Sequence, residues 1–320
     1  MKIWYVKLNK KTIFLDFKFR ICIIIISMLE RTTERAYAKV NFGLKVFPKR
    51  EDGFHNIESV FQTIDLYNTL EISVTNTKDC EVICLNADIP KENTLTKAYQ
   101  AFCQIATVKV PGVKVQITKG IPDGGGLGGS SSDAAALVRG LEKLCGITLS
   151  TEQLDFIADK TGSDVFFFLH CDSEGTGCAL VSGRGEVVKK INPRYDLFLL
   201  LIFPEVRIST KLAYELVDEY LAKGNEKNRS TLDELENVYR TPVEEWAYIN
   251  TFSYALRDEF LELEKAAKDL QEFGALFVQM SGSGSTMYGV FGNEQQAIYA
   301  RNLLAETWNC KTVQVVWFVL

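Results

Sequence analysis

Residues 121–138 read Ile-Pro-Asp-Gly-Gly-Gly-Leu-Gly-Gly-Ser-Ser-Ser-Asp-Ala-Ala-Ala-Leu-Val. Five of these residues are glycines, so the backbone can turn through positive φ and approach a ligand without a Cβ in between. The serines are typical helix N-caps, and Leu137, Leu141 and Leu144 recur at helical spacing, which predicts a helix that starts here. Unpaired N–H groups and the positive end of the helix dipole would then face one point. The stretch therefore predicts a phosphate-binding loop.

Two common phosphate loops fit this stretch poorly. A Walker loop needs Lys and then Ser or Thr after its last glycine, and neither follows here. Gly124, Gly126 and Gly129 match the dinucleotide-binding fingerprint, and a strand expected at 113–118 precedes them, but that fingerprint also needs a strand after the helix. Residues 150–153 instead form a capping box that opens a second helix. A glycine-rich surface turn without a ligand is the remaining alternative.

A third form, Pro-x-x-x-Gly-Leu-Gly-x-Ser-Ser, is met from Pro122 to Ser131. It resembles the ATP loop of the GHMP kinases, a superfamily of small-molecule kinases. The resemblance implies that ATP is bound by Pro122, Asp123, Gly124, Gly125, Gly126, Leu127, Gly128, Gly129, Ser130, Ser131 and Ser132.

Length and composition narrow the class of protein. The chain has 320 residues and 47% hydrophobic content, enough for two ordinary domains. Its net charge of −5 argues against a nucleic-acid partner. The eight cysteines form no C-x-x-C pair, and only His55 and His170 could join them as imidazole ligands, so we expect no metal site of this kind. This cysteine usage suits a reducing cytoplasm.

The first 34 residues are expected to lie outside the fold. Residues 21–26 are intensely apolar, but the run is too short to span a bilayer, and Glu30-Arg31 follows in place of a cleavage site. We interpret the segment as the product of an upstream start, with Met28 just before the recognisable domain. A peripheral membrane anchor is the alternative.

Two short segments with candidate site residues follow this extension. Val40, Phe42, Leu44 and Val46 alternate as in a half-buried strand, which puts Lys39 and Asn41 on its opposite face. Asp52-Gly53 then predicts a turn, with Phe54 and His55 directly after it. An exposed strand lysine and a structural histidine are the ordinary interpretations. Phe54 and His55 together could instead stack on a base and hydrogen-bond to it.

Three segments, 38–41, 50–55 and 64–70, resemble the N-terminal signature of the 4-diphosphocytidyl-2-C-methyl-D-erythritol kinases, one GHMP family. The chain departs from that signature with Tyr37 in place of proline and Phe54 in place of tyrosine. The resemblance implies that Asn41, Phe54 and His55 bind the substrate, the last two at its cytosine.

Further residues are assigned through the same resemblance. Asn93 lies where the family contacts adenine, with a helix N-cap as the equal alternative. Asp164 matches the catalytic aspartate of Gly-Ala-Asp-Val-Pro-Phe-Phe, with Phe166 replacing the proline, and Lys39 would hold that carboxylate ionised. A turn aspartate is the alternative. The remaining substrate-binding residues are Thr210, Tyr214, Ser281, Gly282, Ser283 and Gly284, of which the last four resemble the third GHMP motif. Tyr214 could instead be a core residue of its helix.

The later elements are expected as a buried strand at 197–203, helices at 251–263, 264–273 and 294–307, and a strand at 312–319. The resemblance covers about residues 35–319 and implies an α+β, two-domain GHMP kinase fold. Its N-terminal domain (35–190) would be ribosomal S5 domain 2-like and its C-terminal domain (191–320) ferredoxin-like, with the active site in the cleft between them.

The implied activity is ATP- and Mg²⁺-dependent phosphorylation of a hydroxyl of 4-CDP-2-C-methyl-D-erythritol in the non-mevalonate isoprenoid pathway. No dedicated acidic magnesium ligand stands out beyond Asp164, with Ser131 or Ser132 contributing through water. One alternative is a GHMP kinase for homoserine, mevalonate or a sugar. The other is a catalytically dead nucleotide-binding module.

Overall fold

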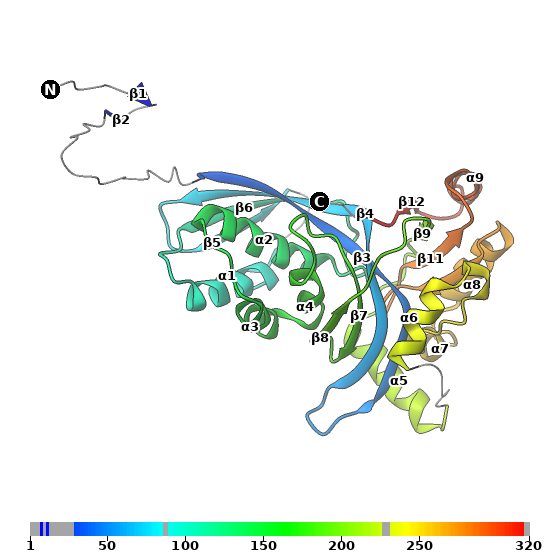
Figure 1. Cartoon of the computed structure of the whole chain (residues 1–320). Coiled ribbons are helices and arrows are strands. Elements are labelled where there is room, and N and C mark those ends of the chain that lie inside the picture. The colour runs from blue at the N-terminus through cyan, green and yellow to red at the C-terminus, as the bar shows by residue number, and fades with distance from the viewer. Residues whose placement is uncertain (1–6, 9–10, 13–28, 86–88, 226–230, 317–320) are drawn as a thin grey trace.

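The computed structural model describes residues 7–8, 11–12, 29–85, 89–225 and 231–316, which form a mixed α+β fold with two main sheets (Figure 1). The first sheet is built on a long antiparallel hairpin of β3 (Arg31–Lys49) and β4 (His55–Thr75). The free edge of β4 is shared by two strands. β6 (Gly112–Thr118) pairs with residues 69–75, and β7 (Cys178–Gly183) pairs with residues 57–62.

Two shorter strands complete the first sheet. β5 (Cys80–Cys84) runs parallel to β6, and β8 (Val187–Lys190) pairs with β7. Four helices cover one face of this sheet (Figure 1). They are α1 (Thr94–Ile105), α2 (Gly129–Cys145), α3 (Thr151–Thr161) and α4 (Ser163–Leu169). The capping box expected at residues 150–153 is present at the start of α3.

The second sheet is antiparallel, in the order β10–β11–β9–β12. Its strands are β9 (Phe198–Ile202), β10 (Phe277–Met280), β11 (Met287–Phe291) and β12 (Cys310–Gln314), with α8 (Leu261–Glu272) and α9 (Glu294–Leu304) packed on it. Between β9 and α8 lie α5 (Thr210–Ala222), α6 (Leu232–Arg240), a 3₁₀ turn (Val243–Glu245) and α7 (Thr251–Leu256).

The expectation that only one face of β3 is buried is wrong. Lys39 is 2% exposed and Asn41 is fully buried, although they alternate with apolar residues. The apolar face, with Val40 and Phe42, packs into a cluster that also contains Leu199 of the second sheet. The polar face lies against the helices and the glycine loop, so the strand centre is enclosed on both sides. Alternation in the sequence cannot distinguish solvent from a buried polar site.

Several expected boundaries also move. β3 already begins at Arg31, and Glu34 is buried beneath Lys143, so residues 31–34 belong to the sheet and not to an extension. The apolar run at 21–26 lies outside the described residues; β1 (Lys7–Leu8) and β2 (Lys11–Thr12) pair with each other. The helices expected at 251–263 and 264–273 are separated at 257–260, α9 ends at 304, and the last strand covers 310–314.

The two sheets share a core. Val40 of β3, Leu199 of β9 and Tyr288 of β11 belong to one apolar cluster. The C-terminal end returns to the first sheet, where the Val316 N–H donates to the Thr63 carbonyl at 3.1 Å. The boundary proposed between residues 190 and 191 falls between the last strand of one sheet and the first strand of the other. None of the helices in the described part of the chain is long and apolar enough to cross a membrane.

Candidate active site

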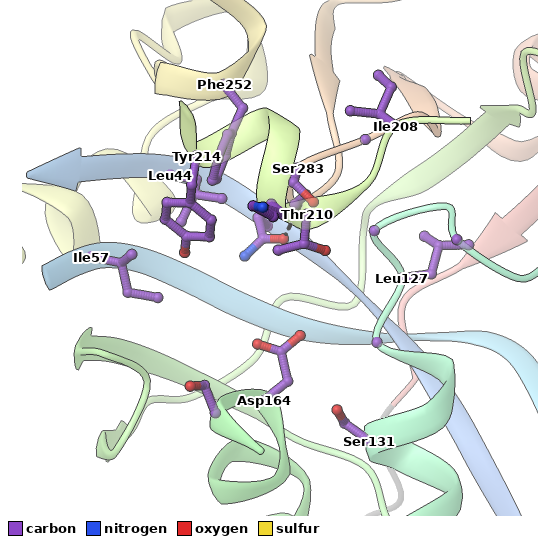
Figure 2. A pocket seen from close by; sticks show the side chains of 18 of the residues that line it. Leu44, Ile57, Leu127, Ser131, Asp164, Ile208, Thr210, Tyr214, Phe252 and Ser283 are labelled. Atoms are coloured by element: carbon purple, nitrogen blue, oxygen red, sulfur yellow. Dashed lines mark hydrogen bonds between the residues drawn. The ribbon is translucent and has the colours of Figure 1, made fainter. Parts of the chain in front are cut away.

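A cavity of about 720 Å³ lies where the β3–β4 hairpin, the glycine loop, α4, α5 and a second glycine loop meet. Figure 2 shows Asp164 and Ser131 on one side of it and Thr210, Tyr214 and Ser283 on the other. Most of the residues proposed from the sequence line this cavity: Lys39, Asn41, Phe54, His55, residues 122–131, Asp164, Thr210, Tyr214 and residues 282–284. Segments far apart in the chain are therefore brought to one place.

The start of α2 is built differently from our expectation. The predicted serine N-cap is wrong, because Gly128 is the N-cap and the three serines lie inside the first turn. Gly128 has φ +72°, and a Cβ there would lie 2.9 Å from the Phe168 ring. No side chain of the described residues caps this turn, so its N–H groups remain available to an anion at the cavity wall.

The second glycine loop braces the first. Ser281 Oγ donates to the Gly126 carbonyl at 3.0 Å, and the Thr286 N–H donates to the Gly125 carbonyl at 3.3 Å. A Cβ on Gly126 would lie 2.1 Å from the Ser281 carbonyl oxygen. Ser281 is fully buried and does not line the cavity, whereas Gly282, Ser283 and Gly284 do. The close approach explains why glycine is needed at position 126.

Lys39 and Asp164, which both line the cavity, form an ion pair. Lys39 Nζ lies 3.5 Å from Asp164 Oδ2 and 4.5 Å from the centre of the Phe61 ring. Burial lowers the pKa of Lys39, and the neighbouring Asp164 opposes that shift. Asp164 lies in the first turn of α4 with its side chain one-third exposed. A carboxylate thus faces the cavity beside a buried ammonium group.

Asn41 joins this pair to the second glycine loop. Its Oδ1 accepts from Lys39 Nζ at 2.7 Å and from the Gly282 N–H at 2.9 Å, while its Nδ2 donates to Ser59 Oγ at 3.2 Å. Both polar atoms of the Asn41 amide are therefore occupied within the protein. This arrangement fixes the position of the lysine ammonium group relative to both glycine loops.

The entrance of the first glycine loop is held by a buried amide. Asn68 Oδ1 accepts from the N–H groups of Gly120 and Ile121, both at 2.9 Å, and its Nδ2 donates to Asp133 Oδ1 at 2.8 Å. Lys119 Nζ lies 3.5 Å from Asp133 Oδ2. Burial raises the pKa of Asp133, an effect that Lys119 opposes. Both ends of the glycine loop are thus tied to one point of β4.

Aromatic side chains gather at the other end of the cavity. The His55 ring stacks on Tyr214, with centroids 4.7 Å apart, and Tyr214 meets Phe252 edge-on at 5.0 Å. Burial raises the pKa of Tyr214 to about 12. Phe54 is 48% exposed at the hairpin tip, with the Arg184 guanidinium 5.2 Å from its ring centre. An aromatic surface here is therefore open to a planar ligand.

Besides Ser281, two of the proposed residues do not line the cavity, Asn93 and Ser132. Asn93 is the N-cap of α1: its Oδ1 accepts from the N–H groups of Leu95 and Thr96, and its Nδ2 donates to the Pro90 carbonyl. This is the geometry that the helix-cap alternative predicts for Asn93. Ser132 is 2% exposed within α2.

Sequence reasoning missed several charged residues that line the cavity: Lys49, Arg184, Lys211, Glu215 and Asp218. Asp218 matters most among them, because its Oδ1 lies 2.8 Å from His55 Nε2. Its spacing of four residues from Tyr214 places both on one face of α5, a signal that could have revealed it.

Comparisons with known proteins identify the family of the chain. The family models for the GHMP kinases N terminal domain and the GHMP kinases C terminal region match residues 93–172 and 235–310. The 4-diphosphocytidyl-2-C-methyl-D-erythritol kinase of Treponema pallidum is 38% identical over 288 residues, 88% of this chain and 97% of the relative. The enzyme of the same name from Thermodesulfovibrio yellowstonii is 35% identical, covering 89% and 98%.

Solved structures show the same fold. A crystal structure of 4-(cytidine 5'-diphospho)-2C-methyl-D-erythritol kinase has a TM-score of 0.72 at 26% identity, covering 90% of this chain and all of that one. The homoserine kinase of Cytophaga hutchinsonii, at 18% identity and a TM-score of 0.66, shares the fold. The resemblance and the α+β GHMP fold inferred from the sequence are confirmed. The chain belongs to the GHMP kinases and, within them, to the 4-diphosphocytidyl-2-C-methyl-D-erythritol kinase family.

Proposed function

We propose that this protein transfers the γ-phosphoryl group of ATP to a hydroxyl of 4-CDP-2-C-methyl-D-erythritol, a step of the non-mevalonate isoprenoid pathway. The relatives named above carry this activity in their names. The observation that carries the proposal is the Lys39–Asp164 ion pair, which lies in the same cavity as the uncapped start of α2 and the Phe54–His55 pair.

Asp164 is proposed as the proton acceptor. The substrate hydroxyl oxygen forms a bond to the γ-phosphorus, the bond from that phosphorus to the β-γ bridging oxygen breaks, and ADP leaves. The hydroxyl proton passes to the Asp164 carboxylate. The Lys39 ammonium group, 3.5 Å from that carboxylate, is proposed to position it and to polarise the attacking oxygen. This charge arrangement speaks against a catalytically dead nucleotide-binding module.

The glycine loop and the start of α2 are proposed to bind the ATP phosphates through backbone N–H groups. Asp164 and the nearby Ser131 hydroxyl are oxygen donors of the kind that Mg²⁺ takes together with substrate phosphates, and we propose that they hold it, Ser131 through water. When bound, Mg²⁺ would neutralise phosphate charge. The described residues contain no cluster of three or more His, Cys, Asp or Glu side chains that could hold a metal without a substrate.

The aromatic end of the cavity is proposed to bind cytosine. Phe54 and Tyr214 offer ring faces, and His55 offers a hydrogen-bonding edge. Base–aromatic stacking contributes about 1–3 kcal/mol per base in nucleic-acid complexes. Thr210 and residues 282–284 lie between the two ends, where the rest of the substrate would pass. We further propose a cytoplasmic enzyme, since the cysteines of the described residues are all free thiols.

A coupled assay of ADP release tests the proposal. We expect turnover with ATP, Mg²⁺ and 4-CDP-2-C-methyl-D-erythritol, and background rates when that substrate is omitted or replaced by homoserine or mevalonate. Turnover of homoserine or mevalonate without any cytidine group would favour another GHMP activity. Background rates with every acceptor would favour the nucleotide-binding module.

A further inference from the structure

His55 is held by a carboxylate from a distant part of the chain. Its Nε2 lies 2.8 Å from Oδ1 of Asp218, on α5, and the two residues are 163 positions apart. The His55 side chain is 6% exposed, and that of Asp218 is 34% exposed. Because one face of the imidazole is covered by the Tyr214 ring, the orientation of its plane is also fixed. Both residues line the active-site cavity.

This contact determines which nitrogen carries the proton. An ionised carboxylate accepts hydrogen bonds and cannot donate them, so His55 Nε2 must be the donor. In the neutral ring, Nδ1 is then an acceptor. Among the residues that the structure describes, none is hydrogen-bonded to His55 Nδ1, so this atom is available to a ligand.

We propose that Asp218 determines which pyrimidine the site accepts. By holding the proton on His55 Nε2, it makes Nδ1 an acceptor. That acceptor suits the amino group at C4 of cytosine and opposes the carbonyl oxygen that uracil carries at the same position. Donation from Nδ1 to uracil would leave a bare Nε2 facing a carboxylate, which is repulsive. The inference rests on the proposed function, because it takes the base end of the cavity as the cytosine site.

Replacing Asp218 by asparagine, which has nearly the same shape, distinguishes control of the His55 tautomer from a purely structural role. In Asp218→Asn the amide can accept from a protonated Nε2 or donate to a bare one, so it permits either tautomer of His55. The variant should therefore gain affinity for uracil without losing cytosine. Glu219→Gln is a matched control, because it removes a charge from the next position of α5, on an exposed side chain that does not line the cavity.

Calorimetric titration with CDP and UDP at mildly alkaline pH measures the selectivity, with thermal melting as a check on folding. We expect the wild type and Glu219→Gln to prefer CDP. In Asp218→Asn the ratio of the dissociation constant of UDP to that of CDP should fall about tenfold. That factor corresponds to the loss of about one hydrogen bond. An unchanged ratio in a folded Asp218→Asn overturns the inference, as does equal binding of CDP and UDP by the wild type.

Nitrogen-15 NMR reports directly which ring nitrogen carries the proton, in the wild type and in the variant. The chain has only two histidines, and His170 Nε2 also lies 2.8 Å from a carboxylate, that of Asp155, so it serves as an internal reference. We expect both rings to be protonated at Nε2 in the CDP complex. In Asp218→Asn with UDP, only His55 should move its proton to Nδ1. A His55 proton on Nδ1 in the wild-type CDP complex overturns the inference, whereas a wild type that binds neither nucleotide overturns the proposed function as well.

Discussion

The two ends of the cavity are built in opposite ways. At the phosphate end the key groups are buried and tied together by hydrogen bonds from both sheets, with Asn41 joining Lys39 to Gly282. At the base end, Phe54 lies half-exposed on a hairpin tip, and side chains rather than backbone make the contacts. Phosphoryl transfer depends on fixed geometry around developing charge, whereas selection of a base needs only a flat surface and a few polar atoms. The two ends should therefore respond differently to substitution.

The largest effect is expected from the proposed catalytic pair, Lys39 and Asp164. Asp164→Asn and Lys39→Ala should each lower kcat by about 10²–10⁴-fold, the usual cost of losing a general base, while ATP still binds through loop amides. The double variant should lose less than the product of the single losses, because the two residues act as a unit. Steady-state kinetics with ATP-binding titrations checks this. A kcat within a few-fold of wild type in Asp164→Asn contradicts the role.

Two glycines with the same φ of +74° test whether contact between the loops matters. Gly124→Ala places its Cβ in open space and should cost only the backbone strain, about 1–2 kcal/mol. Gly126→Ala also meets the Ser281 carbonyl and should cost about 1–3 kcal/mol more, with a raised KM for ATP. Urea unfolding and kinetics measure both. Equal losses in the two variants would show that the loops are not braced against each other.

The buried lysine also predicts a pH dependence. Because burial lowers the pKa of Lys39 from 10.5, its ammonium group is lost at a lower pH than that of an ordinary lysine. In the proposed mechanism the protonated form is the active one, so kcat should decline as pH rises through this lowered value, by about tenfold per pH unit beyond it. A kcat–pH profile between 7 and 11 measures the decline. A flat alkaline limb up to pH 10.5 contradicts the assignment.

At the base end the effect should fall on one substrate. His55→Ala should raise KM for the cytidine substrate about tenfold, the size of one hydrogen bond, and leave KM for ATP nearly unchanged. Initial-rate kinetics with each substrate varied in turn separates the two constants. If both KM values rise equally, His55 serves the shape of the whole cavity and not the base.

The smallest effect is expected at the N-terminus. A chain that starts at Met28 should match the full chain in activity and melting temperature, because β3 begins at Arg31. A chain that starts at Arg35 serves as the contrast, since it removes four β3 residues that pair with residues 70–73, among them the buried Glu34. It should melt at a lower temperature. A large loss in the Met28 variant would show that the preceding segment supports the cavity.

Local patterns allowed much of the site to be predicted. Glycine density marked both loops, and alternation at 40–46 put Lys39 and Asn41 on one face of a strand. The N-cap of α2 was misassigned because Gly128 takes up the left-handed conformation ahead of the serines. Asn93 illustrates a different limit of sequence-based prediction. The same side-chain amide can cap a helix or contact a ligand, and only the surrounding backbone shows which partners it has.

The sequence by itself determined the family, the two glycine loops and the residue types of the proposed catalytic pair, because these depend on short spacings along the chain. Only the tertiary structure decided that Lys39 is buried, that Asn41 connects the two loops and that Asp218 meets His55. Contacts between residues 163 or 241 positions apart leave no local pattern, since they arise where separate elements pack. Burial likewise depends on what covers a face, and a strand carries the same alternation whether water or other elements of the fold lie against it.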